Sequence, residues 1–441
     1  MKVRNIIAAL AALVVALAFQ ACNQTAPADA GSLLATVPAD VSFVAVVNSA
    51  SILEKSDCKI EDAKVIPGKD AMASFDKIKS ADIKSTLTDL LNGDSGIDPS
   101  VMVVFKEGYT TYVTGVAAEP EKFKQSIEQK HNVKFSVKDG IETALNTAVA
   151  GNQFWVSLSG QTSIDINDVR HFSSLAENQS FMQNAYASNL AEVTQDVEMW
   201  CNISGLMNTS GLDFQQRAMA QMALQTLFDD PSALALSFSL AKGEFKIEMK
   251  VLNSKAKPAK FLLPSDKLDI ASIAGIGGTT NMLAAVSVPG KLIEKLKKDT
   301  DKQRTSVLGI YLNELGCLDG TIAYAQSGEN LKGVITTDGK GVATLASFLN
   351  SMDVKTQMNG NVLNISKGQV TGKGSVEQMA NDFKGAIAGM DAADLHEAGF
   401  PANGLASGSL MLYPESGSVT VKVRVLAADK NENPIVLIAN L

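Results

Sequence analysis

Hydrophobic residues occupy every second position in two short stretches, one closing each half of the chain. Residues 243–252 read GEFKIEMKVL and residues 417–426 read GSVTVKVRVL. The alternating apolar positions are Phe245, Ile247, Met249 and Val251 in the first stretch and Val419, Val421, Val423 and Val425 in the second. A period of two predicts β-strands with one face against a core. We therefore expect each half to close with a similar strand.

Further matches between the halves predict an internal duplication. Residues 46–55 (VVNSASILEK) are similar to residues 286–295 (VSVPGKLIEK), and each reads as a strand tail followed by the start of a helix. Gly115 and Gly333 each end a strand that precedes a helical stretch. Repeats of this kind indicate an α+β protein made of two tandem copies of an antiparallel-sheet-plus-helices unit. The expected copies are residues 33–265 and 266–441.

The first copy is longer than the second in two places, near residues 56–100 and near residues 140–240. Residues 70–91 in the first insertion have the apolar spacing of an amphipathic helix. Insertions on a duplicated scaffold are common places for specialised function, although added packing explains them equally well.

The N-terminal segment has the layout of an export signal. Residues 1–21 carry Lys2 and Arg4, then an apolar run from Ile6 to Phe19. As a helix this run spans about 21 Å, which is too short for a hydrocarbon core of ~30 Å. Ala21 and Cys22 resemble the lipobox of bacterial lipoproteins, in which the cysteine is acylated; the alternative is that Cys22 is incidental and the protein is released.

Residues 22–32 are small and polar, which predicts a flexible tether after the lipidated cysteine. By resemblance to lipoprotein sorting signals, Asn23 is not the aspartate of inner-membrane retention, and no acidic cluster for surface export follows Cys22. These features imply an outer-membrane anchor that faces the periplasm.

The net charge and the absence of known motifs argue against nucleic-acid binding, metal binding and a recognisable catalytic site. The 441 residues contain 39 Lys and Arg and 47 Asp and Glu, and removal of Lys2 and Arg4 leaves 37 against 47, a net charge of −10. An acidic surface repels phosphate backbones, so no nucleic-acid partner is expected. The three histidines lack metal-ligand spacing, so no metal or cofactor is expected. Two S-x-x-K matches, Ser56 with Lys59 and Ser74 with Lys77, have no K-T-G partner, and we assign no catalytic residue.

Three cysteines remain after Cys22, at positions 58, 201 and 317. Their wide separation predicts small buried side chains. The alternative is a disulfide between two of them, which an oxidising compartment would allow.

Both tryptophans occupy the polar positions of strand-like stretches. Trp155 alternates with Phe154 and Val156, and Trp200 lies between Glu198 and Asn202 on the same face. An exposed indole beside amide and carboxylate groups is a platform for a sugar ring or a peptide. The alternative is that helices cover this face and place both rings in a core.

Residues 33–56, LLATVPADVSFVAVVNSASILEKS, resemble the start of Bacteroidetes-type lipoproteins of an uncharacterised family, through Pro38, Ala39, Asp40, the strand to Asn48 and the helix start at residues 53–56. The resemblance implies an envelope-anchored α+β protein and transfers no catalytic residue. Three functions stay open. One is a non-catalytic envelope lipoprotein that binds a protein or a polymer such as a polysaccharide. The second is a glycan- or peptide-binding lipoprotein that uses Trp155 and Trp200, and the third is a hydrolase with no recognisable motif.

Overall fold

The computed structural model describes residues 29–61, 64–78, 96–158, 163–209, 213–262, 282–288, 290–291, 293–294, 315–327, 329–369, 386–391, 405–415 and 418–440. The expected signal peptide and Cys22 lie outside these residues, as do residues 79–91 of the expected helix. Within the described ranges the chain is a mixed α+β protein whose strands are antiparallel. None of the helices in those ranges is long and apolar enough to cross a bilayer.

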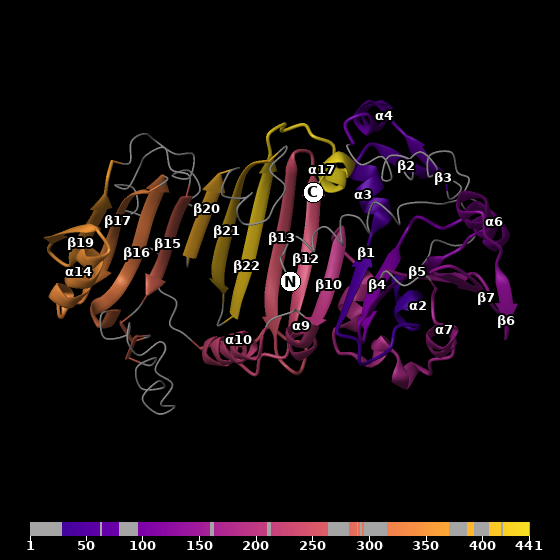
Figure 1. Cartoon of the computed structure of the whole chain (residues 1–441), viewed down its shortest axis with the longest axis horizontal. Helices are drawn as coiled ribbons and strands as arrows, with labels where there is room; N and C mark the ends of the chain where they lie inside the picture. The colour runs from indigo at the N-terminus through magenta and orange to yellow at the C-terminus, as the bar shows by residue number, and fades with distance from the viewer. Residues whose placement is uncertain are drawn as a thin grey trace.

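Among the described residues, most strands belong to one sheet of 18 strands that runs along the length of the molecule (Figure 1). From the outer edge inward, the first half of the chain contributes β6 (Ser136–Lys138), β7 (Ile141–Ala144), β8 (Thr147–Ala150), β9 (Gln153–Ser157), β5 (Thr110–Val116), β4 (Met102–Glu107), β1 (Phe43–Val47), β10 (Val197–Asn202), β12 (Ala233–Ala241) and β13 (Glu244–Leu252). Every neighbouring pair in this series is antiparallel.

The sheet continues into the second half through strand β22. From the junction outward its strands are β22 (Ser418–Ala427), β21 (Leu405–Glu415), β20 (Ala386–Asp391), β15 (Met282–Val288), β16 (Leu318–Ser327), β17 (Asn330–Thr337), β19 (Val362–Lys367) and β18 (Lys355–Asn359). Two small sheets pair β2 (Cys58–Glu61) with β3 (Lys64–Pro67) and β11 (Phe228–Asp229) with β14 (Lys260–Phe261). Two runs of six neighbouring strands, β5-β4-β1-β10-β12-β13 and β17-β16-β15-β20-β21-β22, therefore have the same topology: the chain forms the strands of each run in the same order.

The two alternating stretches pair with each other at the junction. β13 and β22 are antiparallel, with Ile247 opposite Val423 and Met249 opposite Val421. Phe245 and Val425 on this face are 6% and 1% exposed, which confirms the predicted apolar face. The opposite face carries ion pairs, among them Lys422 to Glu248 at 3.0 Å.

Helices cover both faces of the first half. One face packs against α3 (Ser49–Lys55), α4 (Lys69–Phe75), α6 (Pro120–His131) and α17 (Pro434–Asn440). The other packs against α2 (Ala30–Leu34), α7 (Ile166–Ser173), the short 3₁₀ turn η2 (Phe181–Gln183) and α8 (Ala187–Glu192). Successive residues of β1 and β4 alternate between these two hydrophobic cores, as a pleated strand requires. A sheet buried on both faces has no solvent-facing side for its aromatic residues.

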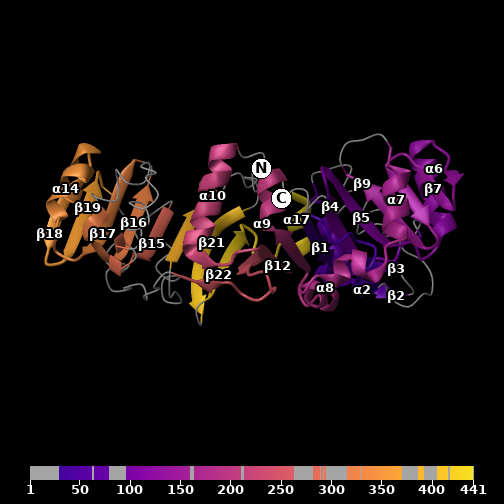
Figure 2. The same ribbon diagram turned by 90° about the horizontal axis from the view of Figure 1, so that it is seen from below.

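Three further helices lie at the edges and in the second half. α9 (Ile203–Thr209) and α10 (Phe214–Leu227) lie at the lower edge of the central strands in Figure 1, as the view from below in Figure 2 also shows. In the second half α14 (Val342–Ser351), with the 3₁₀ turn η3 (Leu315–Cys317), packs on a smaller core that includes Ile335, Leu345 and Leu363.

The expected tether ends earlier than the sequence predicts. Residues 30–34 form α2, and the side chain of Asp29 caps it by accepting the N–H groups of Gly31 and Ser32, both at 3.2 Å. Leu33 and Leu34 are 2% and 0% exposed, because α2 packs against α8. The prediction of a flexible segment is therefore wrong for residues 30–32.

Candidate functional site

Helix α17 belongs to the second half of the chain but packs into the core of the first. Ile435, Val436 and Leu437 are 2%, 0% and 5% exposed, and they share a hydrophobic core with Ile52 and Leu53 of α3. Figure 1 shows α17 beside α3 at the upper edge of the sheet. The C-terminal segment thus joins the two halves of the molecule.

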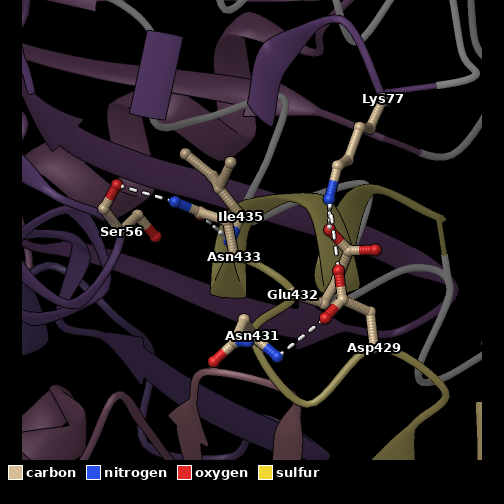
Figure 3. Close-up of polar contacts among 7 residues, drawn as sticks. All are labelled: Ser56, Lys77, Asp429, Asn431, Glu432, Asn433 and Ile435. Atoms are coloured by element: carbon tan, nitrogen blue, oxygen red, sulfur yellow. Dashed lines mark hydrogen bonds and ion pairs between the residues drawn. The ribbon is translucent and has the colours of Figure 1, made fainter. Parts of the chain in front are cut away.

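The buried side chain of Asn433 fixes the start of α17 through two hydrogen bonds. Its Nδ2 donates to the carbonyl oxygen of Ser56 at 2.9 Å, and its Oδ1 accepts the N–H of Ile435 at 3.0 Å (Figure 3). Asn433 is 2% exposed, so both hydrogen bonds are shielded from water. Pro434 occupies the first helical position, where a missing N–H costs nothing.

The loop before α17 holds the ammonium group of Lys77. Lys77 Nζ lies 3.2 Å from Glu432 Oε1 and 3.4 Å from Asp429 Oδ2, as Figure 3 shows. The hydrogen bond and charge of Glu432, followed by those of Asp429, raise the pKa of Lys77. The pKa of Asp429 is lowered, first by the N–H of Asn431 and then by Lys77.

A second ion pair, between Lys242 and Asp70, lines the same cleft as the ion pairs of Lys77. Lys242, in the turn between β12 and β13, lies 2.7 Å from Asp70 of α4. Their hydrogen bond and mutual charge raise the pKa of Lys242 and lower the pKa of Asp70. The next residue, Gly243, has φ +64°, and a Cβ there would lie 2.5 Å from the carbonyl oxygen of Lys430. Glycine at this position therefore lets the turn approach the C-terminal loop.

These segments enclose an open cleft of about 380 Å³. Its lining comprises Asp70, Ala73, Ser74, Lys77, Lys242, Asp429, Asn431 and Asn433. The directions of the four pKa shifts keep both lysines and both aspartates charged at neutral pH. Both ion pairs are about half exposed, so they contribute little to stability and can exchange partners with a bound ligand. The arrangement suits recognition of a partner that carries both signs of charge.

Ser74 and Lys77, one of the two S-x-x-K matches, both line this cleft. A general base must be unprotonated, whereas the carboxylates of Glu432 and Asp429 hold Lys77 in its charged form. In the other match, Ser56 is 0% exposed. This arrangement opposes a serine–lysine reaction at either place.

The expected platform of exposed tryptophans is wrong. Trp155 and Trp200 are 1% and 7% exposed and lie in the hydrophobic core formed with α2, α7 and α8. Trp200 packs edge-on against Phe181, with ring centroids 5.3 Å apart. The polar strand faces were read correctly from the alternation, but helices cover them, so neither ring can stack on a ligand.

The polar neighbours of Trp200 have local structural roles. Glu198 is 8% exposed, and its Oε1 accepts from both the N–H and the hydroxyl of Thr194 at 2.9 Å. Asn202 accepts the N–H of Gly205 at 3.0 Å and so supports the first turn of α9. Both side chains complete turns at the ends of β10.

The three cysteines among the described residues are buried. Cys58, Cys201 and Cys317 form no disulfide with one another, and their burial confirms the prediction of small buried side chains. Burial raises the pKa of both Cys58 and Cys201 to about 12, with a further contribution from Asp57 at Cys58. These thiols are therefore unreactive at neutral pH.

Sequence reasoning did not find the cleft. Its residues come from three segments, and Lys77 lies 352 positions from Asp429 in the chain. The polar run at 429–433 before the apolar residues 434–438 is a signal for a turn and a helix start. Nothing in that run indicates that its contacts lie in the first half.

Comparisons with known proteins add no functional assignment. No family model matches the sequence, and no curated protein matches it. Crystal forms I and III of TP0453 align with 81% of this chain and 97% of theirs, at 10% identity and TM-scores of 0.29 and 0.32. Crystal form IV of TP0453 aligns over 49% of this chain and 79% of its own, at 12% identity and a TM-score of 0.29. At these TM-scores the alignments carry no conclusion about this protein.

Proposed function

We propose that the protein is a non-catalytic lipoprotein of the cell envelope, anchored through a lipid on Cys22 in the outer membrane and facing the periplasm. Its folded body is a binding module for an envelope protein or a polymer. The observation that supports the anchoring is the sequence itself, in which Lys2, Arg4 and the apolar run of residues 6–19 precede Cys22, seven positions before Asp29, the first residue that the structure describes. This spacing suits a body held close to a membrane by its N-terminus.

Replacement of Cys22 by serine tests the anchor, because serine lacks the thiol that the lipid requires. We expect the wild-type protein to enter the detergent phase of a Triton X-114 partition and the Cys22→Ser variant to enter the aqueous phase. A serine replacement at buried Cys317 is the matched control, and it should leave the partition unchanged. Equal partition of the wild-type and Cys22→Ser proteins would refute the lipid anchor.

We also propose that the body consists of two tandem copies of one α+β unit, residues 33–265 and 266–441. The shared strand order and the antiparallel contact of β13 with β22 support this proposal. A helix follows the matching strands β5 and β17 in each half, namely α6 and α14. The extra strands and the helices α7 and α8 of the first half fall in the expected insertion near residues 140–240.

The charged cleft is the proposed contact with the partner. A photo-reactive p-benzoylphenylalanine in place of Asn431, which is exposed and lines the cleft, tests this in intact cells. We expect adducts with one envelope protein or with the sacculus, and their yield should fall about tenfold when Lys242→Glu is added. The same label at exposed Lys340 in the second half is the control. An identical adduct pattern from both positions would contradict a binding role for the cleft.

A further inference from the structure

Three exposed apolar side chains lie together at one edge of the sheet. Tyr109, Leu158 and Leu145 are 92%, 42% and 40% exposed. Tyr109 is at the tip of the β4–β5 hairpin, Leu158 follows β9, and Leu145 is in the turn between β7 and β8. We call these three residues the apolar edge.

Backbone hydrogen bonds place the three residues on neighbouring strands. The N–H of Leu158 donates to the carbonyl of Thr111 at 2.8 Å, and the N–H of Ser157 donates to the carbonyl of Asn146 at 2.8 Å. The end of β9 therefore lies between the two turns that carry Tyr109 and Leu145. Because adjacent strands are ~4.8 Å apart, the three residues lie at neighbouring strand ends on one edge of the sheet.

The local backbone presents these side chains to solvent. Gly108 has φ +56°, which permits the tight turn that projects Tyr109. Leu145 has φ +51°, a conformation that bulky residues rarely adopt. Tyr109 is almost fully exposed and Leu145 keeps 40% of its surface exposed on a strained turn, which points to a contact outside the molecule.

The tether limits how far this edge can lie from a membrane. The seven Cα-to-Cα steps from Cys22 to Asp29 span at most about 25 Å. Helix α2, which follows Asp29, packs against β4, and β4 ends at the turn that carries Tyr109. A lipid on Cys22 would therefore hold Asp29, and with it α2 and the strand β4 on which α2 packs, within about 25 Å of the bilayer surface.

We propose that the apolar edge contacts the membrane in which the lipid on Cys22 is inserted, with the ring of Tyr109 at the headgroup level. This inference rests on the proposed lipid anchor. Tyrosine favours the membrane interface because one end of its ring is apolar and the other is polar. The contact would orient the body on the bilayer and set the direction in which the cleft faces.

The charges beside the edge specify the kind of lipid contact. Burial raises the pKa of Glu107, and the charges of Asp168 and Asp40 add to this effect while His171 opposes it. This acidic rim does not attract anionic headgroups. Binding should therefore come from apolar insertion, and it should persist with phosphatidylethanolamine–phosphatidylcholine vesicles and at 0.5 M salt, where the Debye length is only about 4 Å.

Fluorescence of a Tyr109→Trp variant tests the contact in mature protein that carries Cys22→Ser, so that no lipid contributes. Trp155 and Trp200 are buried and give a background that vesicles should not change. We expect vesicles to shift the emission of the Tyr109→Trp variant to the blue. Met352→Trp is the matched control, since Met352 is 55% exposed on the distant second half, and its emission should not shift.

Sedimentation with the same vesicles gives a second readout. The double variant Tyr109→Ser with Leu158→Ser should bind about tenfold less than the Cys22→Ser parent, because it removes most of the apolar area of the patch. No blue shift, equal shifts at positions 109 and 352, or a shift that needs protein concentration and no vesicles would overturn the proposal. The last result would indicate a protein contact. If the vesicle experiments fail but the wild-type protein enters the detergent phase of the Triton X-114 partition, only the membrane contact of the apolar edge is refuted. If the wild-type protein enters the aqueous phase, the lipid anchor itself is refuted.

Discussion

Replacing Val436 by aspartate is expected to lower the free energy of unfolding by about 4 kcal/mol or more. Val436 is 0% exposed and lies in the core of the first half. A carboxylate there would be surrounded by the apolar side chains of this core, so it must either be buried among them or expel α17. Urea unfolding followed by tryptophan fluorescence reports this directly, because both tryptophans lie in the first half.

Ala428→Asp is the matched control for this change. Ala428 is exposed in the loop before α17, so the same carboxylate should change stability by less than about 0.5 kcal/mol. Leu437→Ala, which removes apolar volume without adding charge, should cost about 2–5 kcal/mol. If Val436→Asp unfolds at the same urea concentration as Ala428→Asp, the C-terminal helix does not belong to the first core.

Replacing Trp155 by alanine is expected to cost about 3–5 kcal/mol, because it leaves a large cavity between the sheet and the helices that cover it. Trp155 is 1% exposed, and its Nε1 has no hydrogen-bond partner among the described residues. Trp155→Phe should therefore cost less, since it removes no hydrogen bond and keeps most of the apolar volume. Thermal melts of the three proteins measure the difference.

Tyr109→Ala provides the comparison for Trp155→Ala, since the ring of Tyr109 is 92% exposed and packs on little. Its melting temperature should stay close to that of the wild type. If Trp155→Ala melts at the same temperature as Tyr109→Ala, Trp155 is not a core residue, and the hypothesis of an exposed tryptophan platform would be supported again.

The strand pattern was predictable because side-chain alternation is a local property. The period of two at Phe245 and Val425 gives the strand and its buried face, and both appear in the structure. The partner of that face is not local. The sequence indicated that the two stretches are alike, but not that they pair with each other at the centre of one sheet.

The tryptophans show where alternation stops being informative. Trp155 and Phe154 point to opposite faces, as predicted, yet each is 1% exposed because both faces are covered. The face of Trp155 is covered by α2, α7 and α8, and α2 lies partly in the segment that composition marked as a tether. Small polar residues such as Ser32 do not exclude a short helix when Asp29 caps it and leucines follow.

The cleft could not be predicted because its charges meet only after the C-terminal helix has docked. Lys77, Lys242 and Asp429 come from segments with no common local pattern. Their convergence depends on α17 packing beside α3 and on Gly243 allowing the turn to approach Lys430. Contacts set by long-range packing leave no periodic signal in the chain.

The intact mass of the mature protein, purified from its own envelope membranes, tests the central claim most directly. A lipid-anchored protein should have a chain that begins at Cys22, with additional mass that alkaline hydrolysis of ester-linked acyl chains reduces. A chain that begins at Met1, or at any residue after Cys22 and without added mass, would contradict the account.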